Sequence, residues 1–387
     1  MNKTLIAAFA VTALASQSSA AGIQLWTVGT FIPSGISGSG NLVVGNGASV
    51  GYWDTSVSGG ALTFVGGNST GRVQASNDGT RFGGTSLAID SFTSNNYNQM
   101  SIYSIAGGAW TSYGNLGYHS GTTASSGWGL SGDGNTVVGQ AYYNTTAVGG
   151  TAARVNPTVG TIPGGPPVNL HPNTTNNGRV QASNFDGTVV GGFAVGTAPG
   201  AIWVNGVEKL MQTDLGSGTV SLGSIEDISN NGRFALGDGS SVTSGSFYIY
   251  DRIADTYTFG PNPYLSNSEI ATMASISSDG RYVGGRYLKS GFSPYVDAKA
   301  FRYDTVTNTF ATLDDLADAA GINRQGFHLG TITGMSDDGM KFVGIGGLLT
   351  APTTTSFYID LTPVPEPGTF ALAGLGAAAL IRRKRKA

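Results

Sequence analysis

The chain has 387 residues, of which 61 are glycine, 40% are hydrophobic and only 11% are charged, a composition too apolar for a disordered chain and typical of a turn-rich, packed β protein. It contains no cysteine, which excludes disulfides, thiolate metal sites and thiol nucleophiles. The formal charge is -3, and without Lys3 and the five C-terminal basic residues the balance is 14 basic against 23 acidic residues, which argues against nucleic acid as a partner.

The chain begins with the pattern of a secretory signal peptide. Lys3 supplies a positive charge, residues 4–15 form an apolar run, and small residues follow at the exit of that run. We therefore expect residues 1–21 to be a signal peptide that signal peptidase cleaves after Ala20 or Ala21. A buried core helix is the alternative, but it does not explain the small residues at the exit.

One phrase recurs seven times in the residues that follow. It consists of Ser, two spacer residues, Gly, and a short β-branched or aromatic run that closes on Gly, with one extra residue in the fourth copy. The closing glycines recur about every 50 residues, a spacing typical of propeller blades or solenoid coils. The seven copies are residues 36–45, 75–84, 130–139, 182–192, 228–237, 276–285 and 335–344.

Each repeat predicts a small antiparallel sheet. Asp-Gly or Asn-Gly between two apolar runs supplies the positive φ of a tight hairpin, so each phrase predicts two strands and their turn. A second apolar phrase, such as residues 300–303, predicts a third strand, and segments such as residues 307–313 a fourth. We therefore predict that residues 22–362 form an all-β, seven-bladed β-propeller with four-stranded blades. The competing architecture, an open β-solenoid, leaves exposed end faces that need caps.

The last repeat predicts how the propeller closes. It stops after its third strand, at residue 360, whereas residues 23–28 have the character of an isolated strand. We expect this N-terminal segment to be the missing outer strand of the last blade. The prediction places Gln24 beside Tyr358.

One segment breaks the β pattern. Residues 312–321 begin with Thr, carry Asp in the first turn and end with Gly, which predicts a short helix. The aspartates complement the helix dipole, and no alternating Asp-x-Asp-x-Asp-Gly loop is present, so we predict no metal site here and no cofactor elsewhere.

The third-strand phrase at Ala300-Phe301 resembles the HAF-repeat family, which is named for a His-Ala-Phe triplet and is often found in secreted bacterial proteins. Lys299 stands where the family has His, and no copy in this chain has the full triplet. The resemblance implies a repeat architecture and leaves the molecular role open.

Residues 363–387 have three consecutive features. Pro365, Glu366 and Pro367 come first, and the prolines disfavour a helix there, which keeps Glu366 extended and accessible. An uncharged run of 13 residues follows; as a helix it spans only about 20 Å of a hydrocarbon core about 30 Å thick, so it is a weak permanent anchor. A basic cluster then favours the cytoplasmic side. The cluster consists of Arg382, Arg383, Lys384, Arg385 and Lys386.

This tail resembles the PEP-CTERM sorting signal, whose pattern is Pro-Glu-Pro, a short hydrophobic segment and an Arg-rich terminus. In that family an exosortase, a membrane-embedded cysteine protease or transpeptidase, recognises the tail, in bacteria that often make extracellular polysaccharide. The resemblance implies brief insertion into the inner membrane, processing, and a mature product at the cell surface or outside the cell. An ordinary tail anchor is the alternative, but it does not need Pro-Glu-Pro.

The sequence indicates no catalytic residues. The three histidines, His119, His171 and His328, lie in separate repeats or connections, and no Gly-x-Ser-x-Gly elbow precedes a helix. Two hypotheses remain. A non-enzymatic surface or matrix protein can bind glycan or another envelope component through Tyr- and Asn-rich loops such as 95–98 and 142–144, although solvated loops without a ligand explain the same residues. A secreted polysaccharide hydrolase or lyase can instead use an acidic pair in the central cleft.

Overall fold

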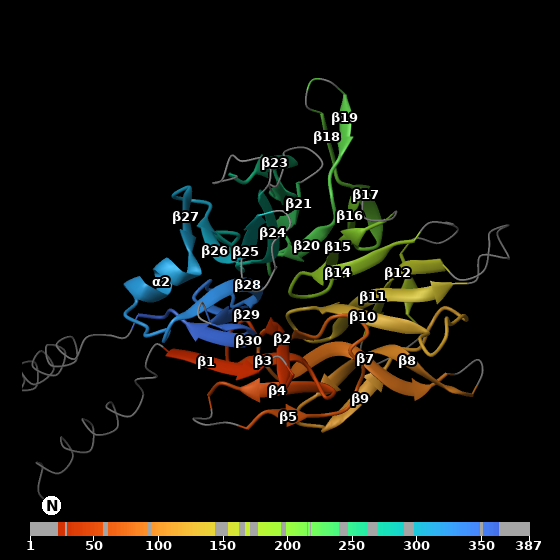
Figure 1. Ribbon diagram of the computed structural model, residues 1–387. Coiled ribbons are helices and arrows are strands. Elements are labelled where there is room, and N and C mark those ends of the chain that lie inside the picture. The colour runs from red at the N-terminus through yellow and green to blue at the C-terminus, as the bar shows by residue number, and fades with distance from the viewer. Residues whose placement is uncertain are drawn as a thin grey trace, which may run out of the picture.

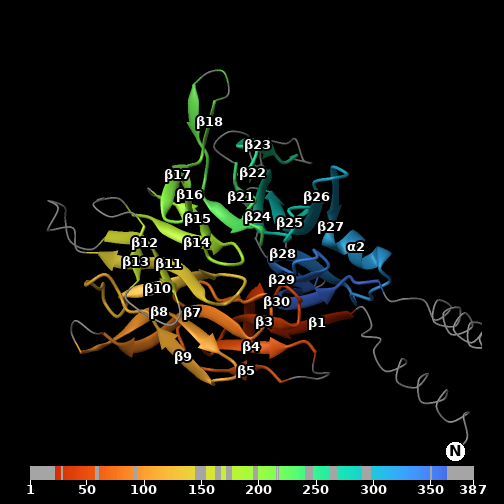
Figure 2. The same ribbon diagram turned by 180° about the vertical axis from the view of Figure 1, so that it is seen from behind.

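The computed structural model describes residues 22–363, except 28, 57–60, 91–93, 144–153, 162–166, 171–176, 195–198, 215, 217, 240–246, 262–268, 290–297 and 349–350. Within these residues, seven four-stranded antiparallel sheets surround a common axis (Figures 1 and 2). The all-β, seven-bladed β-propeller is therefore confirmed. The cleavage positions Ala20 and Ala21 lie outside the described residues, and so do the sorting residues Pro365, Glu366, Pro367, Arg382, Arg383, Lys384, Arg385 and Lys386.

The strands of each blade follow the chain from the axis outward, because the first strand of each blade contacts the first strands of its neighbours. Blade 1 contains β2 (Phe31–Ile36), β3 (Leu42–Gly47), β4 (Val50–Asp54) and β5 (Thr63–Phe64). Blade 2 contains β6 (Gln74–Ala75), β7 (Arg81–Ile89), β8 (Asn96–Ser104) and β9 (Ala109–Ser112). Blade 3 contains β10 (Ser125–Leu130), β11 (Thr136–Tyr143), β12 (Arg154–Thr161) and β13 (Val168–Asn169).

Blade 4 contains β14 (Arg179–Ser183), β15 (Val189–Phe193), β16 (Gly200–Val204) and β17 (Val207–Leu210). Blade 5 contains β20 (Ile225–Ile228), β21 (Phe234–Asp238), β22 (Phe247–Asp251) and β23 (Thr256–Phe259). Blade 6 contains β24 (Glu269–Ile276), β25 (Tyr282–Lys289), β26 (Lys299–Asp304) and β27 (Thr309–Thr312). Blade 7 contains β28 (Phe327–Met335), β29 (Lys341–Leu348), β30 (Ala351–Asp360) and β1 (Gly22–Thr27). A hairpin that the sequence did not predict, β18 (Gln212–Asp214) and β19 (Thr219–Ser221), projects between blades 4 and 5 (Figure 1).

The recurring phrase builds the turn between the first and second strands. In blade 3, the Ser131 hydroxyl donates to Asp133 Oδ1 at 2.6 Å and accepts from the Thr136 N–H at 2.9 Å, while Gly134 supplies a φ of 72°. In blade 4, Asn184 rather than Ser183 takes the serine position, since its side chain accepts from Val189 N–H and donates to Asp186. The fourth turn therefore has no extra residue, and this corrects the alignment made from the sequence.

Closure by the N-terminal strand is confirmed. Strand β1 pairs antiparallel with β30, and Gln24 lies opposite Tyr358; Figure 1 shows the two strands side by side. Trp26 packs edge-on against Trp53 of blade 1 with ring centroids 5.1 Å apart, and Trp53 packs on Tyr358 at 5.3 Å. Such aromatic pairs each add roughly 0.5–1.5 kcal/mol beyond area burial, so they fasten the first blade to the last. The open solenoid is excluded.

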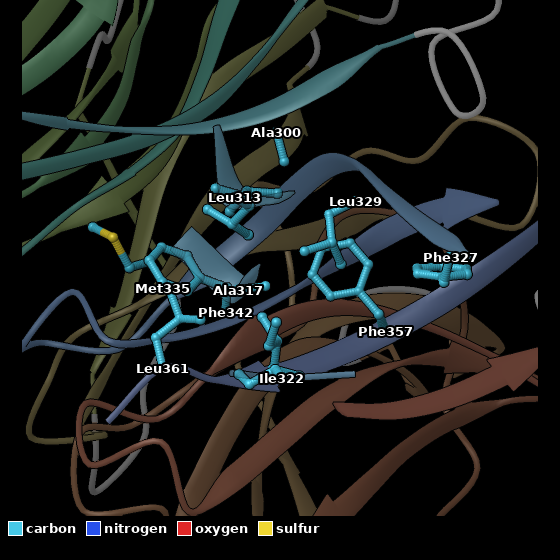
Figure 3. Packing of buried hydrophobic residues seen from close by; sticks show 12 residues of the cluster. Ala300, Leu313, Ala317, Ile322, Phe327, Leu329, Met335, Phe342, Phe357 and Leu361 are labelled. Atoms are coloured by element: carbon cyan, nitrogen blue, oxygen red, sulfur yellow. The ribbon is translucent and has the colours of Figure 1, made fainter. Parts of the chain in front are cut away.

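The predicted short helix is confirmed as α2 (Leu313–Ala319), and the Thr312 hydroxyl caps it by accepting from the Asp315 N–H. Leu313 and Ala317 are buried in the core of the last blade, where Figure 3 shows them near Phe342 and other labelled apolar side chains. In the part of the chain that the structure describes, no helix is both long and apolar enough to cross a membrane.

Candidate functional site

The propeller has two different faces. The turn face carries the seven recurring turns, and the loop face carries the connections between second and third strands and between successive blades. The turns occupy residues 37–40, 76–79, 131–134, 184–187, 229–232, 277–280 and 336–339.

On the turn face, hydrogen bonds join turn to turn around the axis. The Asn77 N–H donates to Gly132 O at 2.8 Å, and the Asp337 N–H donates to Gly38 O at 2.9 Å, which links the last repeat to the first. The Asp337 carboxylate accepts from the side-chain amides of Asn77 and Asn230, both at 2.7 Å. Burial raises the pKa of Asp337, and the Asn230 hydrogen bond opposes that shift. These groups bind one another, so this end of the axis is structural.

A narrow cleft runs along the axis above this network. Its two adjoining parts share Gln74, Leu130, Ser183, Asp227 and Ser275, and they offer about 80 and about 50 Å³ to the centres of water molecules. One water needs roughly 10–15 Å³ on this scale, so the cleft admits a few waters or a small polar group. A sugar ring has to remain at its mouth.

β-bulges place two of the side chains that line the cleft, Gln181 and Glu226. Six of the seven innermost strands carry a bulge at the same position, three residues before the turn Ser or Asn. A bulge bends the strand and redirects a side chain. The bulged residues are Ser34, Trp128, Gln181, Glu226, Ala274 and Thr333.

The bulges of blades 3 to 5 create a charged cluster. The Arg179 guanidinium lies over the Trp128 ring, with Cζ 3.5 Å from the ring centroid, and donates to Gln181 Oε1 through Nε at 3.1 Å and Nη2 at 2.6 Å. Gln181 Nε2 in turn donates to Glu226 Oε1 at 2.8 Å, and Arg72 lies 3.6 Å from the other carboxylate oxygen. We call Arg72, Trp128, Arg179, Gln181 and Glu226 the axial cluster.

Electrostatics distinguish Arg179 from an ordinary surface arginine. Burial lowers the pKa of Arg179 to about 10, the positive charge of Arg72 lowers it further, and Glu226 opposes both effects. Glu226 is paired with Arg72 at 3.6 Å, so the Arg179 guanidinium, which is partly withdrawn from water, has no carboxylate in contact with it among the described residues; charge in such a place is costly.

Asp227, the next residue of β20, acts mainly as a link between blades. Its carboxylate accepts from the Ile228 N–H and from the Ile276 N–H of blade 6, both at 2.8 Å. Burial raises the pKa of Asp227 to about 7, although both backbone bonds oppose the shift.

The Tyr- and Asn-rich segments were predicted as loops, but residues 96–98 begin strand β8 and residues 142–143 end strand β11, which corrects that prediction. These strand ends lie partly together on the loop face. Tyr97 stacks on His119 with ring centroids 4.1 Å apart, and its hydroxyl lies 2.9 Å from His119 Nε2. The Tyr142 N–H donates to Ala124 O, and Ala124 N–H donates to Asn98 O, so the two predicted loops flank one segment. Asn98 is buried and serves the fold, whereas Asn144 lies outside the described residues.

The histidines do not converge. His328 is held between Asp314 Oδ2 at 2.5 Å and Ala298 O at 2.6 Å, beside α2, and the Asp314 hydrogen bond raises its pKa. His119 lies in the connection between blades 2 and 3, and His171 is outside the described residues. Sequence reasoning missed the axial cluster, because its residues come from different repeats and no local pattern marks a β-bulge.

Comparisons with known proteins support the fold and the tail. A family model described as the PEP-CTERM protein-sorting motif matches residues 363–386. A comparison with curated protein sequences finds no match. A chain assigned as TolB from Agrobacterium tumefaciens aligns at 11% identity and a TM-score of 0.45, over 88% of this chain and 98% of that one.

An oligogalacturonate lyase solved with manganese aligns at 9% identity and a TM-score of 0.52, over 89% of this chain and 91% of its own. At this identity the likeness shows the propeller fold alone. The PEP-CTERM motif indicates an exported protein and implies processing by an exosortase-type system.

Proposed function

We propose that this chain is a bacterial cell-surface or extracellular-matrix protein whose propeller is a non-enzymatic binding domain for glycan or another envelope component. The gathering of the axial cluster beside a narrow cleft, which its Arg72, Gln181 and Glu226 line, carries this proposal. Aromatic, amide and guanidinium groups suit the faces and hydroxyls of sugars. The Tyr97–His119 stack supplies a second aromatic surface on the same face.

The seven repeats are proposed to be of the HAF type. The third strand β26 carries Ala300 and Phe301 where that family has its Ala and Phe, and both side chains are buried. Burial explains why Ala and Phe recur at this place in such a repeat, because the third strand packs into the blade core.

The two chain ends suggest how the precursor is held. Gly22 pairs with Asp360, and the Leu361 N–H donates to Met340 O at 2.9 Å, beside the last recurring turn. Only eight residues separate Asp360 from the start of the uncharged run at Thr369, or less than about 30 Å of extended chain. While the tail is transiently inserted in the inner membrane, the turn face is toward the lipid and the loop face points away.

Single cysteines test this orientation cleanly, since the chain has none of its own. Ile89→Cys lies on the loop face and Val306→Cys on the turn face, and the native side chains are 73% and 71% exposed. In spheroplasts that retain the tail, a large impermeant maleimide should label Ile89→Cys faster than Val306→Cys. Equal rates before tail removal would show that the turn face is not covered.

A glycan array together with an activity screen tests the binding function. The mature protein should bind at least one extracellular polysaccharide and release no shortened product. Release of product would contradict the non-enzymatic assignment, and absence of any glycan bound would contradict glycan as the ligand.

A polysaccharide hydrolase or lyase is the second candidate, and one observation favours it. Asp227, whose pKa is raised to about 7, lies beside Glu226 in the same cleft, and a carboxyl of such pKa can act as a general acid. This function requires that Asp227→Asn and Glu226→Gln each abolish turnover. The two backbone bonds that Asp227 accepts favour a structural role instead.

A further inference from the structure

We infer that the axial cluster binds a carboxylate group of an acidic sugar, so that the ligand of the propeller is a polyuronate-type polysaccharide. The inference rests on the proposed binding function and names the chemical class of its ligand. It starts from the charge of the cluster, which is the opposite of that of the chain as a whole.

The cluster has more positive than negative charge. Among the described residues, Glu226 is the one carboxylate within 4.0 Å of either arginine, and it lies against Arg72 rather than Arg179. The Arg179 guanidinium is therefore half-buried and has no carboxylate of its own among the described residues. Proteins pair buried charges, so an anionic group from outside is the missing partner.

Arg179 also has donors to offer. Of its five N–H groups, one on Nε and one on Nη2 point to Gln181 Oε1. No acceptor for the remaining three lies among the described residues. A guanidinium presents paired donors that match the two oxygens of a carboxylate.

The guanidinium is fixed in advance. Trp128 lies against it at 3.5 Å and Phe193 at 5.0 Å, measured from Cζ to the ring centroids, and Gln181 holds one edge. The backbone of Arg72 is fastened as well, since its N–H donates to Gly127 O at 3.0 Å. Because little side-chain freedom remains to be lost, binding costs less entropy.

The size of the cleft agrees with a carboxylate. The part that Arg72, Gln181 and Glu226 line offers about 50 Å³ to water centres, which is room for a few waters, and Gln181 joins it to the Arg179 guanidinium. A carboxylate can replace those waters while its sugar ring stays at the mouth. The acidic balance of the whole chain repels polyanions at long range, so local recognition has to come from the cluster.

Binding of sodium alginate, a polyuronate, tests the inference against dextran, a neutral polysaccharide, and dextran sulfate, measured by calorimetry on the mature protein. We expect alginate to bind at least tenfold more tightly than dextran, and Arg179→Gln to weaken alginate binding at least tenfold. Arg233→Gln, which removes an exposed arginine from the turn face, is the control of equal charge change and should bind as the wild type does.

A second variant guards against misfolding. Among the described residues, Arg72 does not pack on an aromatic ring, as Arg179 does on Trp128 and Phe193, and its side chain is 29% exposed. Arg72→Gln should therefore also weaken alginate binding while its unfolding midpoint stays close to that of the wild type. If Arg179→Gln and Arg72→Gln bind alginate as tightly as the Arg233→Gln control does, the inference is overturned.

The other outcomes separate the inference from the function on which it rests. Dextran bound as tightly as alginate leaves glycan binding intact and overturns the carboxylate assignment. Dextran sulfate or inorganic sulfate competing at the same concentration as alginate shows a general anion site and overturns it too. No polysaccharide bound at all contradicts the proposed function and the inference together.

Discussion

The turn face and the loop face are built from the same seven repeats, but the repeats are alike on the turn face and differ from one another on the loop face. On the turn face each repeat makes its own local network, as Ser131, Asp133 and Gly134 do, and the networks join around the axis. On the loop face the bulged residues differ from blade to blade, from Ser34 to Trp128 to Glu226. The repeat thus supplies the scaffold, and the positions where copies diverge supply the residues of the candidate site.

Glycine substitutions give the largest expected contrast between the faces. Gly280 on the turn face and Gly66 on the loop face have nearly the same φ, 79° and 77°. A Cβ at Gly280 would lie 2.2 Å from the Phe234 ring, whereas nothing lies within 4 Å of one at Gly66. We expect Gly280→Ala to lower the free energy of unfolding by about 2–4 kcal/mol and Gly66→Ala by about 1 kcal/mol.

Urea denaturation of both variants measures this contrast. Equal losses would mean that backbone conformation alone decides the cost, and that the turn face is no more tightly packed than the loop face.

The same contrast explains what the sequence could predict. The turn network needs Ser or Asn, Asp and Gly at fixed spacing, so its seven copies, the blade count and the closing strand could be predicted from local patterns. The Thr312 cap could also be predicted from the sequence, since capping is a local interaction. Even there, Ser183 was mistaken for the turn residue, because its neighbour Asn184 can supply the same hydrogen bonds.

The axial cluster could not be predicted in this way. Arg72, Trp128 and Glu226 come from three different repeats, and only closure of the ring brings them together. No particular residue type marks a β-bulge in a sequence. The innermost strands that carry the bulges are as short and apolar as the other strands of the blades. The β18–β19 hairpin was missed for a related reason, because it lies outside the repeat period.

Asp337 tests whether the turn face depends on its central carboxylate. Asp337→Ala removes the acceptor for Asn77 and Asn230 and should cost about 1–3 kcal/mol, because two half-buried amides lose their partner. Asp337→Asn keeps an oxygen acceptor and removes the buried charge, so at pH 7 it should be at least as stable as the wild type.

The pH dependence of this pair has a definite sign. The folded-state pKa of Asp337 is raised above its usual value of 3.8, so the folded state holds the proton more tightly and wild-type stability falls as pH rises through that window. Asp337→Asn should lack this part of the fall. Thermal unfolding from pH 4 to pH 7 measures it, and parallel curves for the two proteins would contradict the assignment.

On the loop-face side, His328 should act in a different pH window. Its pKa is raised above 6.5, mainly by Asp314, so its contribution is fully present below pH 6.5 and is lost as pH rises through the folded-state pKa. We expect His328→Gln to be less stable than the wild type by on the order of 1 kcal/mol at pH 6. The difference should shrink by pH 9, and a difference that does not change with pH would exclude His328 as its source.

Aromatic residues give the smallest contrast and the most direct test of which face binds. Tyr97→Leu removes the ring that stacks on His119 on the loop face, and Phe185→Leu removes a ring that is 47% exposed on the turn face. Since a stacked ring contributes roughly 0.5–1.5 kcal/mol, Tyr97→Leu should weaken polysaccharide binding about twofold to tenfold, with Phe185→Leu unchanged. Calorimetry with the polysaccharide found on the array measures both. A loss confined to Phe185→Leu would move the binding surface to the turn face, where the C-terminal tail also leaves the propeller.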